Sequence, residues 1–444
     1  MPFKPALKYT GNTRSSPSSD DLRAYIEPLI DSKDQNQLLS LSDDAAQFAL
    51  DLLWERLSSL RPSSEQLANA HRTQLRRLAI RLVMAYDMLP QALRLHGVEC
   101  LESDASFAGS MTDIHRGRYA DKDVALKRLR VYLQFTGAPK TQMRQEFHCG
   151  AITWKTLSHS HVMPFLGISE GIFGRTLCMV VPWMENGTII RHIRALRDHG
   201  QLSGSGFSHH VNNWIRQIAS GLAYLHSEDV MHGNLRGNNI LITLDGKAQI
   251  ADFDMTRMSE TFLETYASIP GEATRWYSPE RLDPELFDMD SNRPTCASDV
   301  YSFACACVEL YTLEAPFSGI NNYKVGGEIV KGNRPLRPTS PDGEPISDRL
   351  WNVITQCWAQ QPSQRPSADE VVHMAEQVLD SAMVKSSSVP PRSSSSQSGK
   401  RFAKTPTKEA MLPLAPTSTR QKSDSSGIVY QCFNRWFRRT GKAE

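Results

Sequence analysis

The sequence lacks the long apolar runs, paired cysteines and leader that mark membrane or secreted proteins. Its longest apolar runs, such as 177–182, fall far short of the ~20 residues that a membrane-spanning helix needs. The N-terminus MPFKPALKYT contains no apolar core of a signal peptide. None of the eight cysteines forms a CxxC pair, which favours buried free thiols in a reducing compartment. We therefore expect a soluble, intracellular and cytoplasmic protein.

The whole chain also lacks a strong excess of charge of one sign, since its formal net charge is +2. No nucleic-acid partner is therefore expected. The charge is unevenly distributed, however. Residues 381–444 hold twelve Lys or Arg and three Asp or Glu, a net charge of +9, whereas residues 1–380 hold 38 and 45, a net charge of −7. An acidic body is thus joined to a basic tail.

Both ends of the chain are polar. Residues 1–19 are rich in Ser and Pro, and residues 381–444 form a Ser-rich basic tail, so both segments are predicted to be disordered. Near the end, residues 428–439 (IVYQCFNRWFRR) place apolar side chains near one helical face beside arginines. Two interpretations stay open: a basic helix that makes a weak contact with a membrane surface or a protein, or a solvated tail.

Residues 20–95 predict a helical extension. A first helix can begin at Asp20 and end near Ile30, a second spans 45–60, and a third opens at 63–65 and stops at Pro90. The apolar stripe of these helices can be a packing face or a groove for a partner, and the sequence favours the packing face.

Residues 96–380 predict a domain of two lobes. A small lobe extends to about residue 183, with β-type segments at 120–129 and 177–181 and one helix at 140–157. The residues that follow are mainly helical, with loops rich in Gly, Pro and Asn.

Within this domain six motifs occur in a fixed order. Each motif alone would be a weak signal, whereas the ordered set is a strong one. They are 124–127 (VALK), 232–239 (HGNLRGNN), 252–254 (DFD), 278–280 (SPE), 299–303 (DVYSF), and Trp358 followed by 364–366 (QRP).

The ordered set resembles a protein kinase of the tyrosine-kinase-like group, and in detail the large set of such kinases in basidiomycete fungi. The resemblance covers about 280 residues and implies an α+β fold: a two-lobed kinase domain with an α-helical N-terminal extension and a disordered C-terminal tail. It also implies ATP and Mg²⁺ as cofactors, and a protein substrate or partner that the sequence does not identify. The detailed likeness lies in 154–159 (WKTLSH), 164–167 (PFLG), 182–187 (PWMENG) and 221–226 (GLAYLH).

The resemblance assigns Lys127 to the α- and β-phosphates of ATP. Its usual partner is a helix glutamate, and alignment of 147–154 with the family pattern places Gly150 at that position. The ion pair is therefore predicted to be missing. Glu146 lies one turn earlier, and a shift of the helix could bring it to Lys127.

The resemblance also places the nucleotide base. Ile114, Ala125 and Leu241 should enclose adenine, with contacts from the segment between Pro182 and Met184. The glycine-rich loop that should cover the phosphates keeps only Gly109 of its three glycines, while Phe107 and Thr112 occupy the other two positions. Side chains there hinder the close approach of backbone amides to phosphate oxygens.

Asn234 stands where the family has its catalytic aspartate. An amide cannot accept the proton of a substrate hydroxyl as a carboxylate can, and loss of a general base typically costs about 10²–10⁴ in rate. Arg236 in the same loop and Thr274, just before Arg275 and Trp276, complete the predicted catalytic set. Thr274 fits a pocket for Ser or Thr substrates.

The metal ligands are retained in the sequence. Asp252 should bind Mg²⁺ between the β- and γ-phosphates, and Asn239 the second ion, since oxygen ligands suit Mg²⁺. Asp254 replaces the usual glycine and adds a charge beside them.

Three hypotheses follow from these residues. The first is a pseudokinase, a nucleotide-binding or nucleotide-independent signalling scaffold that acts through partners. The second is a weakly active Ser/Thr kinase that transfers the γ-phosphate of ATP to protein hydroxyls. The third is an interaction module with no ATP site, which Lys127, Asn239 and Asp252 argue against.

Overall fold

The computed structural model describes the chain from residue 18 to residue 387, with seven internal gaps. The described ranges are 18–32, 35–60, 66–108, 112–130, 132, 136–174, 176–253 and 272–387. The disorder predicted for both ends of the chain lies mostly outside these ranges. The amphipathic pattern at 428–439 lies wholly outside them and stays a prediction.

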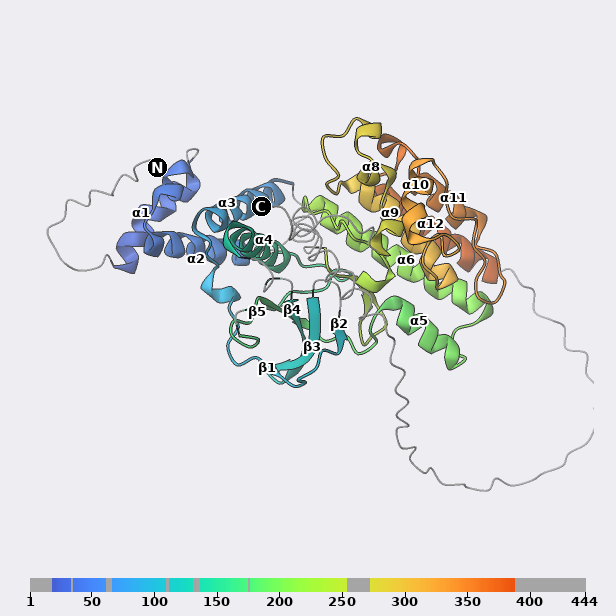
Figure 1. The fold of residues 1–444 in the computed structure, drawn as a ribbon, viewed down its shortest axis with the longest axis horizontal. Helices are drawn as coiled ribbons and strands as arrows, with labels where there is room; N and C mark the ends of the chain where they lie inside the picture. Colours follow the sequence, from blue (N-terminus) through green and yellow to red (C-terminus); the bar gives the residue numbers. More distant parts are fainter. Residues whose placement is uncertain are drawn as a thin grey trace, which may run out of the picture. The chain divides into compact units, whose positions relative to one another are not determined.

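The small lobe is a six-stranded antiparallel sheet on which one helix packs (Figure 1). The strand order is β1-β3-β4-β6-β5, with β2 paired to β3. The strands are β1 (Glu99–Cys100), β2 (Phe107–Ala108), β3 (Thr112–Tyr119), β4 (Lys122–Leu129), β5 (Gly167–Ile168) and β6 (Cys178–Pro182).

The two faces of β4 belong to different apolar clusters. Val124 and Leu126 pack in a small cluster on one face, whereas Ala125 faces the main core that continues toward the helices. This separation follows from the two-residue period of a strand. Since Lys127 lies two residues after Ala125, it points to the same face, toward the main core.

The strand predicted at 120–129 begins two residues later than expected. Ala120 and Asp121 have φ values of 46° and 60° and form the turn between β3 and β4. Strand β3 itself was not predicted, because its sequence TDIHRGRY carries few apolar residues to reveal a strand period.

Helix α4 (Gly137–Lys155) corresponds to the helix predicted at 140–157. Met143, Phe147, Gly150 and Trp154 recur at helical spacing and are all buried. This buried stripe fixes which face of α4 is turned to the core.

The large lobe is mainly helical. Helix α9 is buried along nearly its whole length, and α6 packs along α12 (Figure 1). Its elements are α5 (Ile189–Asp198), α6 (Gly204–Ser227), η4 (Gly237–Asn239), β7 (Ile240–Ile242), β8 (Ala248–Ile250), η5 (Glu272–Trp276), α8 (Pro279–Leu282), η6 (Glu285–Phe287), α9 (Cys296–Thr312), α10 (Asn322–Val330), α11 (Asp348–Cys357), η7 (Pro362–Gln364) and α12 (Ala368–Ser387).

The arginine of the QRP motif, Arg365, is buried. Arg365 makes two parallel hydrogen bonds to Glu280, of 2.7 and 2.8 Å, and both side chains are at most 1% exposed. The same guanidinium donates to the carbonyls of Ala359 and Ala297. It therefore ties the SPE segment to the start of α9 and to the loop before α12.

Helix α12 corrects the boundary predicted at residue 380. It continues to Ser387, so residues 381–387 are helical and do not belong to a disordered tail. The reason is local: Ala382, Met383 and Val384 extend the apolar pattern of the helix, and Pro390 is the first residue that would break it.

The helical extension forms as predicted, as α1 (Ser19–Asp31), α2 (Asp43–Ser59) and α3 (Gln66–Tyr86), with η1 (Gln35–Ser40) after α1 and η2 (Gln91–Leu93) after α3. Its first helix is capped by Ser18, which accepts from the backbone N–H of Asp21 in a capping box. The apolar stripe is a packing face: Leu53 and Leu57 of α2 and Leu78 and Leu82 of α3 are buried in the main core.

The expectation of buried free thiols holds for five cysteines. All seven cysteines in the described ranges are free, but Cys296 is exposed and Cys100 is partly exposed. Cys296 is exposed because it opens helix α9 at the surface.

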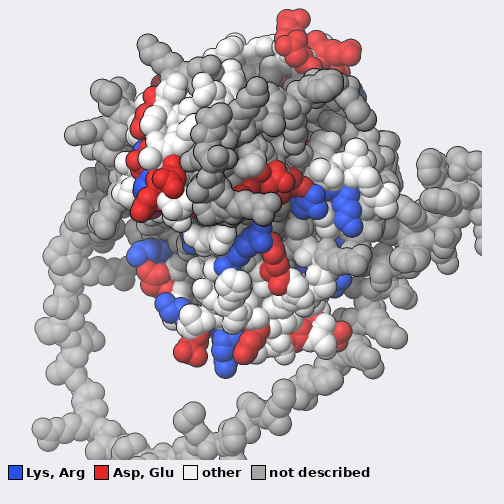
Figure 2. Space-filling view, turned by 90° about the vertical axis from the view of Figure 1, so that its left-hand side faces the viewer, with Lys and Arg blue, Asp and Glu red and all other residues white. Residues whose placement is uncertain are grey.

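Charges of both signs are mixed on the surface of the described residues that Figure 2 shows. On the face shown in Figure 2, Lys and Arg are interspersed with Asp and Glu, so the described residues there present no block of one sign. None of the helices in the described ranges is both long enough and apolar enough to cross a membrane.

Candidate functional site

Lys127 and Asp252 form an ion pair at the junction of the lobes. Lys127 lies on β4 and is 4% exposed, and its Nζ contacts Oδ1 of Asp252. Asp252 follows β8 with φ of 66°, a left-handed conformation that Asp adopts more readily than most residues. A buried ammonium needs a compensating partner, and Asp252 supplies it here.

Helix α4 presents no carboxylate to Lys127 from position 150. The Nζ of Lys127 lies 5.9 Å from the ring centre of Trp154, which follows Gly150 by one helical turn. Gly150 therefore lies on the stripe of α4 that faces Lys127. Glu146, on the same stripe, accepts a hydrogen bond of 3.1 Å from Gln142. The structure pairs Lys127 with Asp252, and no ion pair among the described residues joins Lys127 to Glu146.

The loop that contains Asn234 is held by a buried carboxylate of α9. The backbone N–H groups of His232 and Gly233 donate to Oδ2 and Oδ1 of Asp299, each at 2.7 Å. Gly233 has φ of 72°, which suits glycine. Nε2 of His226 lies 3.0 Å from the same carboxylate. Asp299 thus fixes the backbone immediately before Asn234.

Asn239 joins the Asn234 loop to the segment of Asp252. Its Nδ2 donates to the carbonyl oxygen of Asn234 at 2.7 Å, and its own carbonyl oxygen accepts from the N–H of Ala251 at 2.9 Å. Since Nδ2 is used as a donor, Oδ1 is the atom of Asn239 that can face a cation. The buried amide oxygen of Asn234 makes no hydrogen bond with any described residue.

Arg236 and Thr274 lie in different surroundings. The guanidinium of Arg236 lies 5.8 Å from the ring centre of Trp276. Thr274 is buried in η5, where its methyl group approaches Gly326 of α10. Arg236 belongs to the predicted catalytic loop itself, whereas no hydrogen bond within the described part of the chain joins Thr274 to the amide oxygen of Asn234.

The residues predicted to hold the adenine base come from four strands, β3, β4, β6 and β7, and from the segment after β6. Register pairs Ile114 with Lys127 and Ala125 with Val181, which puts all four on one face of the sheet. Leu241 of β7, in the large lobe, is partly buried against the main core. Pro182 ends β6, and the carbonyl oxygen of Met184 accepts from Gly187 at 2.9 Å. Gly109 lies outside the described residues, as does Asp254.

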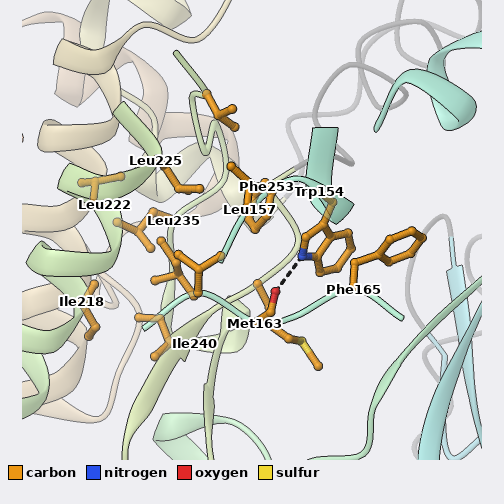
Figure 3. Packing of buried hydrophobic residues seen from close by; sticks show 14 of the residues in the cluster. Trp154, Leu157, Met163, Phe165, Ile218, Leu222, Leu225, Leu235, Ile240 and Phe253 are labelled. Atoms are coloured by element: carbon orange, nitrogen blue, oxygen red, sulfur yellow. Dashed lines mark hydrogen bonds between the residues drawn. The ribbon is translucent and has the colours of Figure 1, made fainter. Parts of the chain in front are cut away.

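An aromatic stack joins the two lobes. The ring of Phe253 lies 5.1 Å from that of Trp154 and 6.1 Å from that of His232. Trp154 also stacks on Phe165 at 5.3 Å and donates from Nε1 to the carbonyl oxygen of Met163 at 2.7 Å (Figure 3). The apolar frame around the site is therefore intact.

Sequence reasoning missed the buried carboxylate of Glu309 in α9. It accepts hydrogen bonds from the N–H of Gly237 at 2.8 Å and from Nε1 of Trp276 at 2.9 Å. Burial raises the pKa of Glu309 to about 7. A glutamate within the apolar sequence ACACVEL was the available signal, because such a residue is buried only when it has partners.

The pair His226–Asp299 predicts a pH dependence of stability. Burial alone would lower the pKa of His226, but the hydrogen bonds to Asp299 and Cys296 raise it to about 9. A folded-state pKa above the unfolded value of 6.5 gives stability that is complete below pH 6.5 and lost as the pH rises through 9. We expect the melting temperature to fall across this range, corresponding to roughly 3 kcal/mol.

The matched variant is His226→Gln, which keeps a donor for Asp299 but does not titrate. Its melting temperature should change little between pH 6.5 and 9. An equal slope in both proteins would show that the histidine is not responsible.

Comparison with known proteins agrees with this geometry. The model of the protein tyrosine and serine/threonine kinase family matches residues 107–374, more than half of the chain. The chain belongs to this family.

Similar curated proteins carry kinase names. A probable serine/threonine-protein kinase of Dictyostelium discoideum is 27% identical over 266 residues, which cover 60% of this chain and 18% of the relative. Two Arabidopsis thaliana proteins are 24% identical: serine/threonine-protein kinase STY17, over 61% of this chain and 43% of the relative, and serine/threonine/tyrosine-protein kinase HT1, over 61% and 64%. The chain thus spans less than two thirds of the length of each of these relatives.

Proposed function

We propose that this chain is a pseudokinase: a kinase-domain signalling protein that binds ATP but transfers phosphate poorly or not at all, and that acts through protein partners. The observation that carries the proposal is Asn234. The backbone immediately before it is anchored through Asp299, while its side chain offers an amide where phosphoryl transfer requires a base.

The chemical cost of the amide is large. General-base catalysis typically contributes about 10²–10⁴ in rate, equal to about 3–5 kcal/mol of barrier at ~1.36 kcal/mol per tenfold. Gly150 adds to the deficit, because Lys127 pairs with Asp252 and must leave this partner, or share it, to contact phosphate.

The retained residues support ATP and Mg²⁺ as ligands. Asp252 and the amide oxygen of Asn239 would hold the metal, since oxygen donors suit Mg²⁺. When bound, the metal would neutralise charge on the phosphates. Lys127 would contact the phosphates, while Ile114 and the Pro182–Met184 segment would hold the base.

A second candidate is a weakly active Ser/Thr kinase. It is favoured by the amide oxygen of Asn234, which is buried without a hydrogen-bond partner in the described residues and could orient a substrate hydroxyl. Thr274 and the names of the relatives favour Ser/Thr substrates over tyrosine. The motifs at 154–159 and 182–187 further support membership of the tyrosine-kinase-like group expanded in basidiomycete fungi.

Thermal unfolding with and without ATP tests the nucleotide site. Saturating ATP at about 100 times its dissociation constant should stabilise the folded chain by about 2.7 kcal/mol. Lys127→Met should remove most of this shift, because it deletes the cation that faces the phosphates. If millimolar ATP leaves the melting temperature of the unmodified chain unchanged, with or without Mg²⁺, the proposed ATP site is wrong.

A further inference from the structure

Helix α3 of the extension is joined to the large lobe by a buried ion cluster. Arg72 and Arg76, one turn apart on α3, both contact the carboxylate of Glu228, with a distance of 3.0 Å from Nη1 of Arg76 to Oε2. All three side chains are at most 4% exposed. Glu228 lies directly after α6 and caps its end. Charges buried to this extent are costly to separate.

The same cluster holds the C-terminal end of helix α4. Nη1 of Arg72 donates to the carbonyl oxygen of Thr156 at 2.6 Å, and Thr156 is the C-cap of α4. A guanidinium at this place satisfies a carbonyl that the helix itself leaves unpaired. Arg72 therefore links α4 of the small lobe to Glu228 of the large lobe.

The other end of α3 holds the first half of α4. Asp87, just after α3, pairs with Arg144, and its Oδ1 lies 3.5 Å from Nδ1 of His148. Burial lowers the pKa of His148 to about 4, so the cation facing Asp87 near neutral pH is Arg144. Nε2 of Gln145 also donates to the carbonyl oxygen of Met84 at 3.0 Å.

Helix α4 is thus held by α3 at two places, and Figure 1 shows the two helices side by side. We infer that Arg72 and Asp87 are positioning residues, which keep α4 in the register that places Gly150 before Lys127 and holds Glu146 one turn away. A shift that exchanged Glu146 for Gly150 would move α4 by about 6 Å along its axis. Such a movement breaks both the Arg72–Thr156 and the Asp87–Arg144 contacts.

This inference deepens the proposed function. It rests on that function only in the statements about Lys127 and nucleotide. The two contacts explain why Lys127 has no ion pair with α4, although Glu146 on the same helix could provide one. The extension then acts as an internal brace that fixes α4.

Hydrogen exchange of the full chain tests the positioning without any nucleotide. In Arg72→Gln, Glu228 keeps Arg76 as a partner, so the fold should persist while the contact to Thr156 is lost. We expect exchange in α4 to rise about tenfold while α9 keeps its protection, because only local opening is promoted. Arg77→Gln, which removes the exposed pair with Asp229 on the same helix, should match the unmodified chain.

Asp87→Asn gives an independent second variant. Asn tolerates the positive φ of 55° at this position as well as Asp does, so the backbone is preserved while the charge facing Arg144 is removed. Exchange in α4 should rise here too. An equal rise in α4 and α9 in both variants, or no rise in α4, would overturn the inference.

Nucleotide affinity supplies the readout that a merely structural role would not change. Glu146→Gln should leave the affinity for ATP unaltered in the unmodified chain, but should weaken it about fivefold or more in the double variant Arg72→Gln/Asp87→Asn, where both contacts to α4 are removed and the released helix can bring Glu146 to Lys127. Equal effects in both backgrounds would contradict the inference. If ATP binds neither protein, the proposed function fails, and the exchange result still decides the positioning.

Discussion

Replacing Asn234 by Asp together with Gly150 by Glu is expected to raise phosphoryl transfer to a basic acceptor protein by about 10²–10⁴-fold. The new aspartate supplies the base that the amide lacks. The new glutamate lies on the stripe of α4 that faces Lys127, and so can take over the ammonium and release Asp252 for metal. Transfer of labelled phosphate from the γ-position of ATP measures the effect.

The control for this gain is a third substitution, Asp252→Ala, in the double variant. It should abolish the acquired activity, because it removes the proposed metal ligand while leaving the new base in place. An unmodified chain that already works at the rate of the double variant would refute the diagnosis of lost chemistry. A double variant that binds ATP yet remains inactive would show that the deficit lies elsewhere, with the glycine-poor loop at Gly109 as the next place to test.

Replacing Arg365 by Met should lower the free energy of unfolding by about 3–5 kcal/mol, since it leaves the carboxylate of Glu280 buried without its cation. The double variant Arg365→Met with Glu280→Leu should recover most of this loss, because no charge is then left unpaired. Urea unfolding of the three proteins measures the effect.

The control variant is Arg77→Gln. In the pair of Arg77 with Asp229, both side chains are more than 60% exposed. Exposed pairs contribute about 0–1 kcal/mol, so this variant should unfold close to the unmodified chain. Equal losses of stability in Arg365→Met and Arg77→Gln would mean that burial does not determine how much the Arg365–Glu280 pair contributes to the free energy of unfolding.

Much of the fold could be predicted because local patterns and motif order agree. The helical period located α1 to α4 within a few residues, and the order of VALK, HGNLRGNN and DFD indicated the two lobes. For the candidate site, the sequence predicted that Lys127, Asn239 and Asp252 belong to a single site. The structure joins Lys127 to Asp252, and links Asn239 through Ala251 to the segment that contains Asp252.

The rest depends on contacts that local patterns do not encode. Arg72 and Glu228 are 156 residues apart in the chain, and nothing in either segment identifies the other as its partner. The pairing of Lys127 with Asp252 likewise arises because Gly150 leaves the ammonium without a helix partner. Absence of a side chain is visible in a sequence, but the group that replaces it is decided by packing in three dimensions.

Phosphoryl transfer by the unmodified full chain, measured beside its Asp252→Ala variant with ATP, Mg²⁺ and a basic acceptor protein, tests the central claim most directly. The account predicts that the two proteins incorporate label at the same background rate. Robust incorporation by the unmodified chain that disappears in Asp252→Ala would contradict it, because a site that depends on its metal ligand and turns over is a working kinase.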